Sequence, residues 1–499
     1  MTAQTKNSEI EITELARAAF GPELIITGDD ARSRLNPGVD PTSLDCGLVA
    51  LPRTVGDIQN IVKWCVDKDI SIVTHGGRTG VTGATSTQPG QMVLDTRHVE
   101  KNLEVDPASG MAVVSAGITL AELEEAAAPH GLHPGIEIGS RSACTVGGLI
   151  STNAGGAEVF RYGMMRQRVV GLEAVLADGS LMVDMPLVRK SNMGIDVKQL
   201  LIGGEGTLGI ITKAVLKLVA IQPYTRTLMI VFDSMQSAVD MVGRFNQLTN
   251  ASVAKADFIQ WKEYIAKCLS VGNDQCLTLA HSALASIEEN TESLGDKDLF
   301  ERNPKDLIFV IAEFDSSCEP DDGILWTDAL EAVTGDGFID AVFAKNEKER
   351  AALWAIRDEW PSNDRLPTGI KYDYDDEIEF DVSVPIKSLP ALIDFIHEAP
   401  TVLGINATPS YVGHLIDGNI HLSYQSETNL DAWAPKLSEY IITKVKQLSG
   451  SFSAEHGIGA YKREWLERYG DPGHISLMRT IKLALDPKGI LNPGKVLEL

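Results

Sequence analysis

Two histidines seven residues apart give this sequence its clearest capacity for chemistry. They lie in the segment Gly413-His-Leu-Ile-Asp-Gly-Asn-Ile-His-Leu-Ser423. On one straight strand this spacing would put His414 and His421 on opposite faces, so that they would not share an ion. A two-residue turn at Asp417-Gly418 would instead place them directly opposite each other on one face of a hairpin. A turn centred on Gly418-Asn419 would shift the register and lose the pair, and two hydrogen-bonded histidines without an ion are the alternative interpretation.

An adjacent acid and imidazole form the second reactive feature, in Ser453-Ala-Glu-His-Gly-Ile-Gly459. Neighbouring side chains normally diverge, but the two glycines that follow permit an irregular backbone that directs Glu455 and His456 to one site. Two histidines and one carboxylate are the ligand set of a catalytic divalent-metal site with open coordination positions. A metal site of His414, His421 and Glu455 is therefore a hypothesis of the sequence.

Two stretches of small residues have the composition of anion-binding loops. The first, Gly76-Gly-Arg-Thr-Gly80, follows an expected helix over 55–69 and an expected strand over 70–73. Small side chains leave consecutive backbone N–H groups accessible to a phosphate, although a plain surface turn is the alternative. The second, Thr145-Val-Gly-Gly-Leu-Ile-Ser-Thr-Asn-Ala-Gly-Gly156, adds hydroxyl and amide donors. Two such loops suit a dinucleotide.

A third glycine motif, Gly204-Glu-Gly-Thr-Leu-Gly209, matches the G-x-G-x-x-G pattern of Rossmann domains. That fingerprint must follow a strand and open a helix. Here the following residues, 210–219, alternate and are β-rich, which favours a tight turn before a strand over an NAD site.

Composition and charge narrow the functional classes. The chain has 499 residues and a formal net charge of −25, which disfavours binding to nucleic acid or to anionic lipid. No apolar run approaches the roughly 20 residues that span a bilayer, so we expect no integral membrane segment. The N-terminus has the pattern of neither a signal peptide nor a transit peptide, and we expect a cytoplasmic protein. The six cysteines form no C-x-x-C pair, which indicates neither a disulfide framework nor a cysteine zinc site.

The expected elements divide the chain into four segments. These are an N-terminal segment over 1–45, a cofactor-binding domain over 46–222, a substrate or cap domain with the histidine hairpin over 223–450, and a C-terminal segment over 451–499 that completes the active site. In the third segment, strand-like and helical stretches alternate, which predicts an α+β domain. The strand-like stretches are 227–233, 307–314 and 378–385, and the helical ones include 346–357 and 388–398.

In combination, these motifs resemble the flavoprotein family of vanillyl-alcohol oxidase fold, specifically its FAD-dependent D-2-hydroxyacid dehydrogenases, which include D-lactate and D-2-hydroxyglutarate dehydrogenases. The resemblance covers roughly residues 51–499 and also rests on Arg161-Tyr-Gly163 and Gly203-Gly204. It implies an α+β fold with an FAD-binding domain and a cap domain over the isoalloxazine ring. The residues that it implies for FAD binding are Gly76, Gly77, Arg78, Thr79, Gly80, Thr145, Gly148, Ser151, Asn153, Gly155, Gly156, Gly206, Ile210 and Asn492.

The resemblance also implies a metal site and a reaction. His414, His421 and Glu455 would bind a divalent metal such as Zn²⁺ or Mn²⁺, which lowers the pKa of the substrate hydroxyl. His456 would act as the base, and hydride would pass from C2 of a D-2-hydroxy acid to flavin N5. Asn419 matches the position that hydrogen-bonds the C1 carboxylate. Arg357 matches the family's substrate arginine, although without the resemblance it would be interpreted as a solvated helix charge.

The sequence departs from the family pattern at three places. Where members with covalent flavin have a histidine after the paired glycines, this chain has Arg78, so we expect non-covalent FAD. Glu379 replaces a lysine that contacts the distal carboxylate of 2-hydroxyglutarate, and Pro361 replaces a threonine. Lys371-Tyr-Asp373 could be a shifted equivalent. We therefore rank a D-2-hydroxy acid with another tail above 2-hydroxyglutarate.

Other functions remain as alternatives to this prediction. They are D-2-hydroxyglutarate dehydrogenation proper, metal-independent alcohol oxidation or alkyl transfer on the same FAD fold, and a non-enzymatic electron carrier or metal store. Because no NAD fingerprint is found, an electron-transferring flavoprotein or a quinone is the expected electron acceptor. The family resemblance allows a homodimer.

Overall fold

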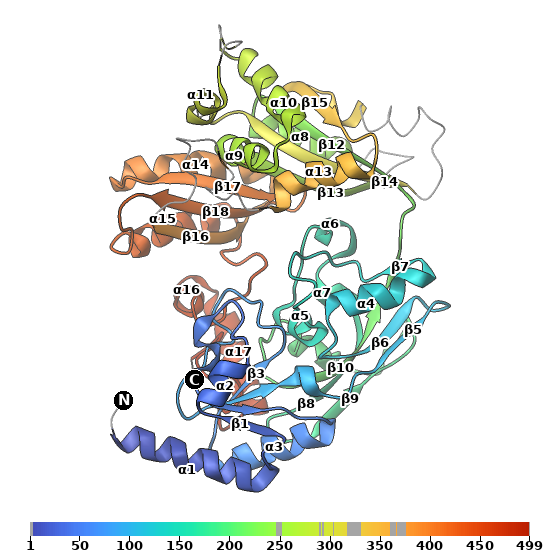
Figure 1. Cartoon of the computed structure of the whole chain (residues 1–499), viewed down its shortest axis with the longest axis vertical. Helices are drawn as coiled ribbons and strands as arrows, with labels where there is room; N and C mark the ends of the chain where they lie inside the picture. Colours follow the sequence, from blue (N-terminus) through green and yellow to red (C-terminus); the bar gives the residue numbers. More distant parts are fainter. Residues whose placement is uncertain are drawn as a thin grey trace. The chain divides into compact units, whose positions relative to one another are not determined.

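A computed structural model describes residues 3–245, 252–288, 291, 294–302, 304–316, 331–359, 366 and 376–498. Pro361 and the segment 371–373, which bear on the substrate prediction, lie outside the described residues. The chain divides into two compact units (Figure 1). Unit 1 comprises Met1–Gly156, Tyr162–Ile221 and Glu455–Leu499, and unit 2 comprises Ala157–Arg161 and Gln222–Ala454. The segment ends expected at 45, 222 and 450 stay predictions.

Unit 1 is built on two main sheets. Its strands are β1 (Ile25–Thr27), β2 (Leu48–Ala50), β3 (Ile72–His75), β4 (Met92–Asp95), β5 (Leu103–Asp106), β6 (Met111–Ser115), β7 (Leu132–His133), β8 (Val169–Val175), β9 (Leu181–Asp184), β10 (Ile210–Lys217) and β11 (Val219–Ala220). A four-stranded sheet has the order β1-β2-β4-β3, and its β2-β4 and β4-β3 pairs are parallel. A five-stranded antiparallel sheet has the order β5-β6-β10-β8-β9, and β11 pairs with β7.

Helices cover both sheets of unit 1. They are α1 (Ala3–Phe20), α2 (Asp29–Arg34), α3 (Val55–Lys68), α4 (Leu120–Ala127), α5 (Val146–Thr152), α7 (Met165–Arg168), α16 (Arg463–Tyr469) and α17 (Pro472–Leu485), with α6 (Val159–Tyr162) at the sequence junction with unit 2. Short 3₁₀ helices are η1 (Pro41–Leu44), η2 (Thr96–His98), η3 (Ala128–His130) and η4 (Val197–Leu200).

Helix α3 shows how local sequence sets these elements. Thr54 caps its first turn reciprocally with Asp57, and Asp69 in the left-handed conformation ends it. Its apolar stripe, Ile58, Ile61, Val62 and Cys65, is fully buried against the four-stranded sheet.

The C-terminal segment belongs to the core of unit 1. Leu491 forms a parallel bridge with Ile72 at the edge of the four-stranded sheet, and Ile490 is buried beside it. A segment too short to fold alone is thereby ordered by packing on strands more than 400 positions earlier in the sequence.

Unit 2 is built on one seven-stranded antiparallel sheet. Its strands are β12 (Tyr224–Phe232), β13 (Ser252–Gln260), β14 (Ile308–Ser316), β15 (Phe338–Phe343), β16 (Asp376–Ser383), β17 (Thr408–His414) and β18 (Asn419–Ser426). The strand order is β15-β12-β14-β13-β17-β18-β16 (Figure 1).

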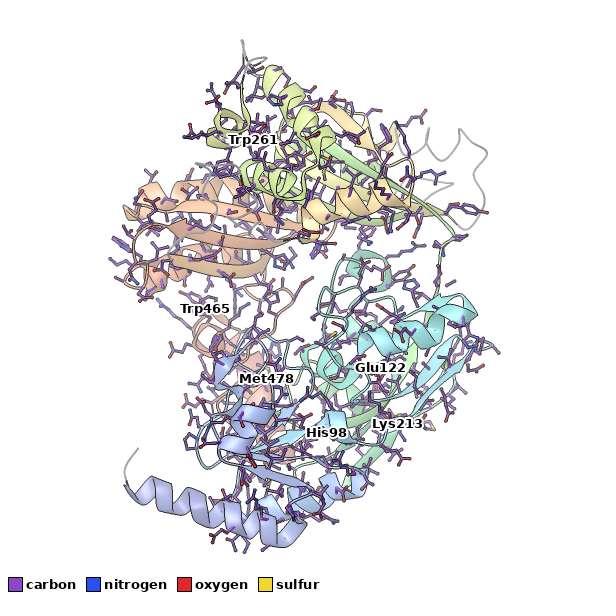
Figure 2. The ribbon with its side chains drawn as sticks, viewed as in Figure 1. His98, Glu122, Lys213, Trp261, Trp465 and Met478 are labelled. Atoms are coloured by element: carbon purple, nitrogen blue, oxygen red, sulfur yellow. The ribbon has the colours of Figure 1, made fainter. Side chains whose placement is uncertain are left out.

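Helices pack on both faces of this sheet. They are α8 (Met235–Phe245), α9 (Trp261–Val271), α10 (Asp274–Ala285), α11 (Asp296–Glu301), α13 (Glu347–Asp358), α14 (Leu389–Leu403) and α15 (Ala434–Gln447), with the 3₁₀ helix η5 (Ile386–Ser388). One apolar core joins α9, α10, α11 and α13 to the sheet, and Trp261 is fully buried in it (Figure 2). On the opposite face, Phe245 of α8 packs edge-to-face on Phe314, and Tyr424 donates a hydrogen bond to the carbonyl of Ile396 in α14.

Among the described residues, no helix combines the length and apolar character needed to cross a bilayer.

Candidate active site

The two histidines lie on the hairpin of β17 and β18, but not in the predicted register. His414 pairs with Asn419, and His421 pairs with Val412, so direct opposition of the histidines was wrong. The connection has four residues, 415–418, instead of the two expected at Asp417-Gly418. The N–H of Gly418 donates to the carbonyl of His414, and the N–H of Asn419 to Oδ1 of Asp417. Because residues two apart share a face, the histidines are still diagonal neighbours on one face of the sheet.

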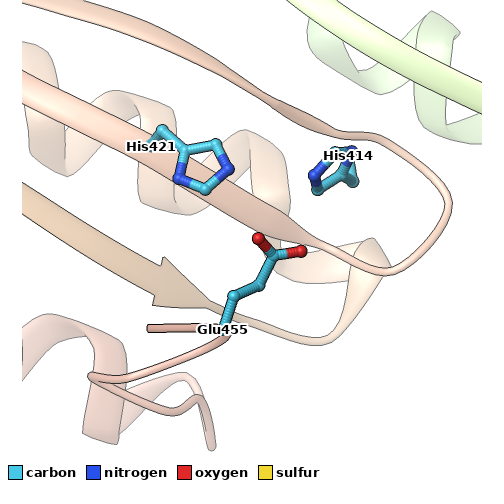
Figure 3. Close-up of side chains that lie close together, drawn as sticks. All are labelled: His414, His421 and Glu455. Atoms are coloured by element: carbon cyan, nitrogen blue, oxygen red, sulfur yellow. The ribbon is translucent and has the colours of Figure 1, made fainter. Parts of the chain in front are cut away.

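The hairpin brings the two imidazoles and Glu455 together (Figure 3). One ligand atom from each of His414, His421 and Glu455 lies within 4.8 Å of the others. The ring centroids of the histidines are 5.6 Å apart, and the rings are nearly perpendicular, at 85°. Two imidazole nitrogens and a carboxylate at this separation can coordinate one divalent ion.

Local contacts hold the chain beside the hairpin just before Glu455. Ser451 forms an antiparallel bridge with Ser383 of β16, and the N–H of Ala454 donates to Oδ2 of Asp381 at 3.2 Å. Asp381 lies directly opposite His421 in the β16-β18 ladder. Glu455 is therefore one peptide away from a residue bound to the sheet that carries the histidines.

A carboxylate that the sequence analysis did not single out, Asp257 of β13, fixes the orientation of His414. The two residues are directly opposite each other across β13 and β17, and Nδ1 of His414 lies 2.7 Å from Oδ1 of Asp257. Burial alone would raise the pKa of Asp257, but the charges of His414 and Arg357 lower it to about 2. The carboxylate therefore accepts, Nδ1 donates, and Nε2 is the nitrogen that can coordinate an ion.

Arg357 contacts the other oxygen of the same carboxylate. Its Nε donates to Oδ2 of Asp257 at 2.8 Å, and the carbonyl of Arg357, in the last turn of α13, accepts from Nζ of Lys267. The arginine side chain is 15% exposed and the aspartate side chain 2%. The structure thus brings Arg357, the predicted substrate arginine, to the strand beside the histidine hairpin, where it is already paired with an acid.

Asn419 shares the face of the sheet that carries His421. It is 3% exposed, and neither Oδ1 nor Nδ2 of its buried amide forms a hydrogen bond. A buried amide left unsatisfied costs free energy, so a polar group of a ligand is the natural partner for it. Binding of the C1 carboxylate by Asn419 stays a prediction.

The loop after Glu455 is held by Glu205, a second residue that the sequence analysis did not assign to a site. The Glu205 carboxylate accepts hydrogen bonds from the N–H groups of Ile458 at 2.7 Å and Gly459 at 2.8 Å. Burial raises the pKa of Glu205, and these two N–H groups oppose the shift. The carbonyl of His456 accepts from the Thr82 hydroxyl at 3.4 Å, so the half-buried His456 lies close to the first glycine loop within unit 1.

The two predicted anion loops meet at glycines. A Cβ on Gly76 would lie 2.3 Å from Oγ1 of Thr145, and one on Gly77 would lie 2.1 Å from the carbonyl of Ala143. Any larger residue would push the loops apart, which explains the paired glycines physically. At the far end of the second loop, Gly156 has a φ of +111°. A Cβ on Gly156 would lie as close to the carbonyl of Glu137 as a Cβ on Gly77 would to that of Ala143.

The remaining residues predicted to bind FAD lie on four features of unit 1. Arg78, Thr79 and Gly80 complete the first loop, and Arg78 has a φ of +55°. Thr145 caps α5, Gly148 and Ser151 lie in it, and Asn153 ends it in the left-handed conformation before Gly155. Gly206 lies in a tight turn that leads directly into β10 at Ile210, so the rejection of a Rossmann fingerprint is confirmed. Asn492 donates to the carbonyl of Glu205 in that turn at 2.7 Å.

Buried polar atoms without a hydrogen bond gather around the first loop. They include Oγ1 of Thr74, Nη1 of Arg78 and Oδ1 of Asn492. A Cβ on Gly80 would have no neighbouring atom within 4 Å. Unsatisfied donors and acceptors beside an open glycine loop fit the phosphates and hydroxyls of a dinucleotide such as FAD.

The site residues that the sequence predicted lie in motifs, whereas those that it missed do not. The histidines, Glu455 and the glycine loops stand in recognisable motifs, whereas Asp257 is the one acid of β13 and Asp381 is one of several acids of β16. An acid within an otherwise apolar alternating strand, as in Ala256-Asp-Phe-Ile259, is the one sequence signal that could have indicated Asp257.

Comparisons with known proteins identify the family of the chain. A family model described as "FAD binding domain" matches residues 47–183, and one described as "FAD linked oxidases, C-terminal domain" matches residues 221–496. A mitochondrial D-2-hydroxyglutarate dehydrogenase of Bos taurus is 30% identical over 519 residues, which covers 99% of this chain and 88% of that protein. A D-2-hydroxyglutarate–pyruvate transhydrogenase of Saccharomyces cerevisiae is 31% identical over 460 residues, covering 90% of this chain and 86% of the relative.

Two solved structures share the fold. p-Cresol methylhydroxylase aligns with a TM-score of 0.70 at 16% identity, covering 100% of this chain and 98% of the other. Alkyldihydroxyacetonephosphate synthase aligns with a TM-score of 0.67 at 20% identity, covering 97% and 84%. The predicted fold class, an α+β flavoprotein with an FAD-binding domain and a cap domain, is confirmed.

Proposed function

This chain belongs to the family of FAD-linked oxidases, and on that premise we propose that it oxidises a D-2-hydroxy acid to the 2-oxo acid with the help of a divalent metal. The observation that carries the proposal is the cluster of His414, His421 and Glu455. Metal-independent alcohol oxidation or alkyl transfer would give this cluster no function. The relatives named D-2-hydroxyglutarate dehydrogenases support the reaction class.

The metal would be held by Nε2 of His414, one imidazole nitrogen of His421 and a carboxylate oxygen of Glu455. When bound, a divalent cation such as Zn²⁺ or Mn²⁺ supplies a Lewis acid that lowers the pKa of the substrate hydroxyl and orients it. The hydrogen bond from His414 Nδ1 to Asp257 fixes the tautomer and ring orientation that direct Nε2 toward the ion.

Three residues of the chain would act on the substrate directly. The unsatisfied amide of Asn419 donates to the C1 carboxylate, which places the reacting carbon. The imidazole of His456 takes the hydroxyl proton, a transfer that histidine performs near neutral pH. The guanidinium of Arg357, which is bound to Asp257 on the same face of the hairpin sheet, would face the substrate tail.

The glycine loops of unit 1 and Asn492 would hold FAD without a covalent bond. When bound, FAD supplies the acceptor for the hydride that leaves C2. Arg78 occupies the place of the attaching histidine, so acid denaturation should release all flavin into solution. An electron-transferring flavoprotein or a quinone would reoxidise the enzyme, and a homodimer and a cytoplasmic location remain predictions.

A second candidate is D-2-hydroxyglutarate itself, which the names of the relatives favour. An anaerobic panel distinguishes the two. Purified FAD-bound protein is mixed with the D and L forms of lactate, 2-hydroxybutyrate, malate and 2-hydroxyglutarate, and the visible absorbance of the flavin is followed. We expect rapid bleaching by D forms and none by L forms. Bleaching by no hydroxy acid would contradict the proposal.

A further inference from the structure

We propose that Asp257 sets the substrate class of this site by cancelling the charge of Arg357, so that the site accepts 2-hydroxy acids with one carboxylate and disfavours those with a second. The inference deepens the proposed function and rests on it. It concerns the tail of the substrate, whereas the metal cluster concerns the reacting end.

The geometry of the pair carries the first step. Both oxygens of the buried Asp257 carboxylate are used, Oδ1 by His414 and Oδ2 by Nε of Arg357. An arginine beside a metal site would by itself attract a second carboxylate, since guanidinium binds carboxylates strongly. Here the nearest anion is part of the protein, at 2.8 Å, and the pair has no net charge. A substrate carboxylate would have to compete with Asp257 for the same cation.

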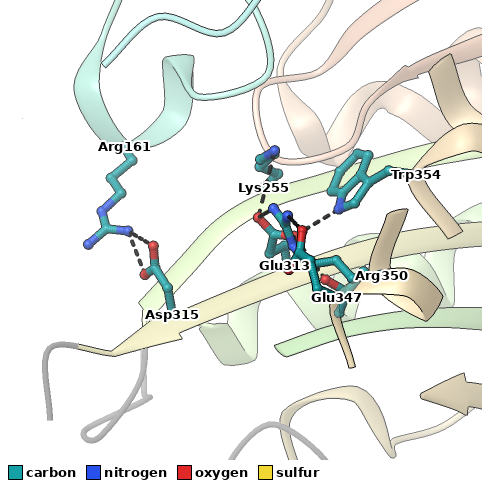
Figure 4. Close-up of polar contacts among 8 residues, drawn as sticks. Arg161, Lys255, Glu313, Asp315, Glu347, Arg350 and Trp354 are labelled. Carbon is teal, nitrogen blue, oxygen red and sulfur yellow. Dashed lines mark hydrogen bonds and ion pairs between the residues drawn. The ribbon is translucent and has the colours of Figure 1, made fainter. Parts of the chain in front are cut away.

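Three other cations described on this face of the sheet are also paired with acids (Figure 4). Arg161 binds Asp315 at 2.5 Å. Arg350 binds Glu313 and Glu347, and Glu313 also faces Lys255 at 3.6 Å. The Lys255 ammonium lies 4.4 Å from the centre of the Trp354 ring. These groups therefore offer no surplus positive charge to a dicarboxylate.

Two further acids lie on the same face near the histidines. Asp381 is directly opposite His421 on β16, and Glu379 is two residues before it and so shares its face. A second substrate carboxylate directed toward β16 would meet like charge, which raises the cost of binding it. Lys371 is outside the described residues, so discrimination by the wild-type protein is itself part of the test.

The experiment compares binding and turnover of matched acids by Asp257→Asn and wild-type protein, both loaded with FAD and saturating metal. Calorimetry measures the affinities for 2-oxobutyrate and 2-oxoglutarate, and anaerobic flavin reduction measures kcat/KM for D-2-hydroxybutyrate and D-2-hydroxyglutarate. We expect wild-type protein to prefer the monocarboxylates. Asp257→Asn should raise the dicarboxylate-to-monocarboxylate ratio of affinities and of kcat/KM at least about tenfold, because no carboxylate then balances the charge of Arg357.

Controls separate this effect from general damage. Glu467→Gln removes a carboxylate from an arginine pair of α16 and α17 in unit 1 and should leave the ratio unchanged. If Asp257→Asn does not fold, Arg357→Met tests the same balance, since it leaves Asp257 uncompensated and should lower the ratio.

The possible outcomes distinguish a failure of this inference from a failure of the proposed function. A wild-type preference for dicarboxylates, or an unchanged ratio in the variant that folds, overturns the inference while leaving the proposed function intact. If no hydroxy acid reduces the flavin, the proposed function fails. The calorimetric ratio, which needs no turnover, then still decides whether Asp257 controls the charge of the site.

Discussion

Asp257 and His414 face each other across neighbouring strands, with Oδ1 and Nδ1 2.7 Å apart. The pairing places a buried carboxylate behind the imidazole, on the side away from the coordinating nitrogen. Carboxylates in this position fix the tautomer of a ligand histidine and increase its basicity. In the proposed metal site, the acid that would orient His414 is thus two strands away from the second histidine.

The first prediction concerns metal affinity. Asp257→Ala should weaken metal binding roughly 10- to 100-fold, because His414 loses the acceptor that fixes its tautomer. Competition with a chromophoric chelator measures the affinity. Asp315→Ala is the matched control, and equal affinities in the two variants would show that Asp257 has no such role.

The second prediction concerns the loop that carries Glu455 and His456. Glu205→Gln should lower kcat and metal affinity while FAD content stays unchanged, because one of the two backbone N–H groups at Ile458 and Gly459 loses its acceptor. Flavin content and metal stoichiometry are measured on the same sample. Loss of flavin together with metal would indicate general unfolding of unit 1 instead.

The third prediction concerns the connection of the hairpin. A Cβ on Gly418 would lie 2.0 Å from the carbonyl of Val384, and its φ is +78°. Gly404 has a similar φ of +68° but open space around it. Gly404→Ala should therefore cost only the left-handed strain, about 1–2 kcal/mol, whereas Gly418→Ala should cost clearly more and reduce metal binding. Chemical unfolding measures both, and equal costs would contradict the observed loop.

The fourth prediction is a pH dependence of stability. Burial would raise the pKa of Glu313, but the Arg350 hydrogen bonds and the charge of Lys255 lower it overall. A depressed folded-state pKa contributes stability above the unfolded value of about 4.3, and this contribution is lost as the pH falls further. The difference in unfolding free energy between wild-type protein and Glu313→Gln should therefore narrow from pH 5 toward pH 3. A difference in unfolding free energy that stays constant over this pH range would contradict the lowered pKa of Glu313.

How far the sequence predicts this molecule depends on the range of the interactions. Helix α3 and the turn before β10 follow from local signals, namely a capping box, a 3.6-residue period and glycines at positive φ. The predicted hairpin register was wrong: the connection has four residues, and Gly418 lies against the carbonyl of Val384 at positive φ, a contact that no local pattern indicates. Asp257 and Glu205 act across 157 and more than 250 positions, so only the folded chain identifies their partners.

The central claim is that the two imidazoles and Glu455 hold a metal needed for oxidation of a hydroxy acid. The most direct measurement is elemental analysis of the purified protein combined with anaerobic flavin bleaching by D-2-hydroxybutyrate, before and after exhaustive chelation. We expect about one divalent ion per chain, loss of bleaching on chelation with FAD retained, and recovery on adding Zn²⁺ or Mn²⁺. Undiminished bleaching by fully chelated protein would contradict the account.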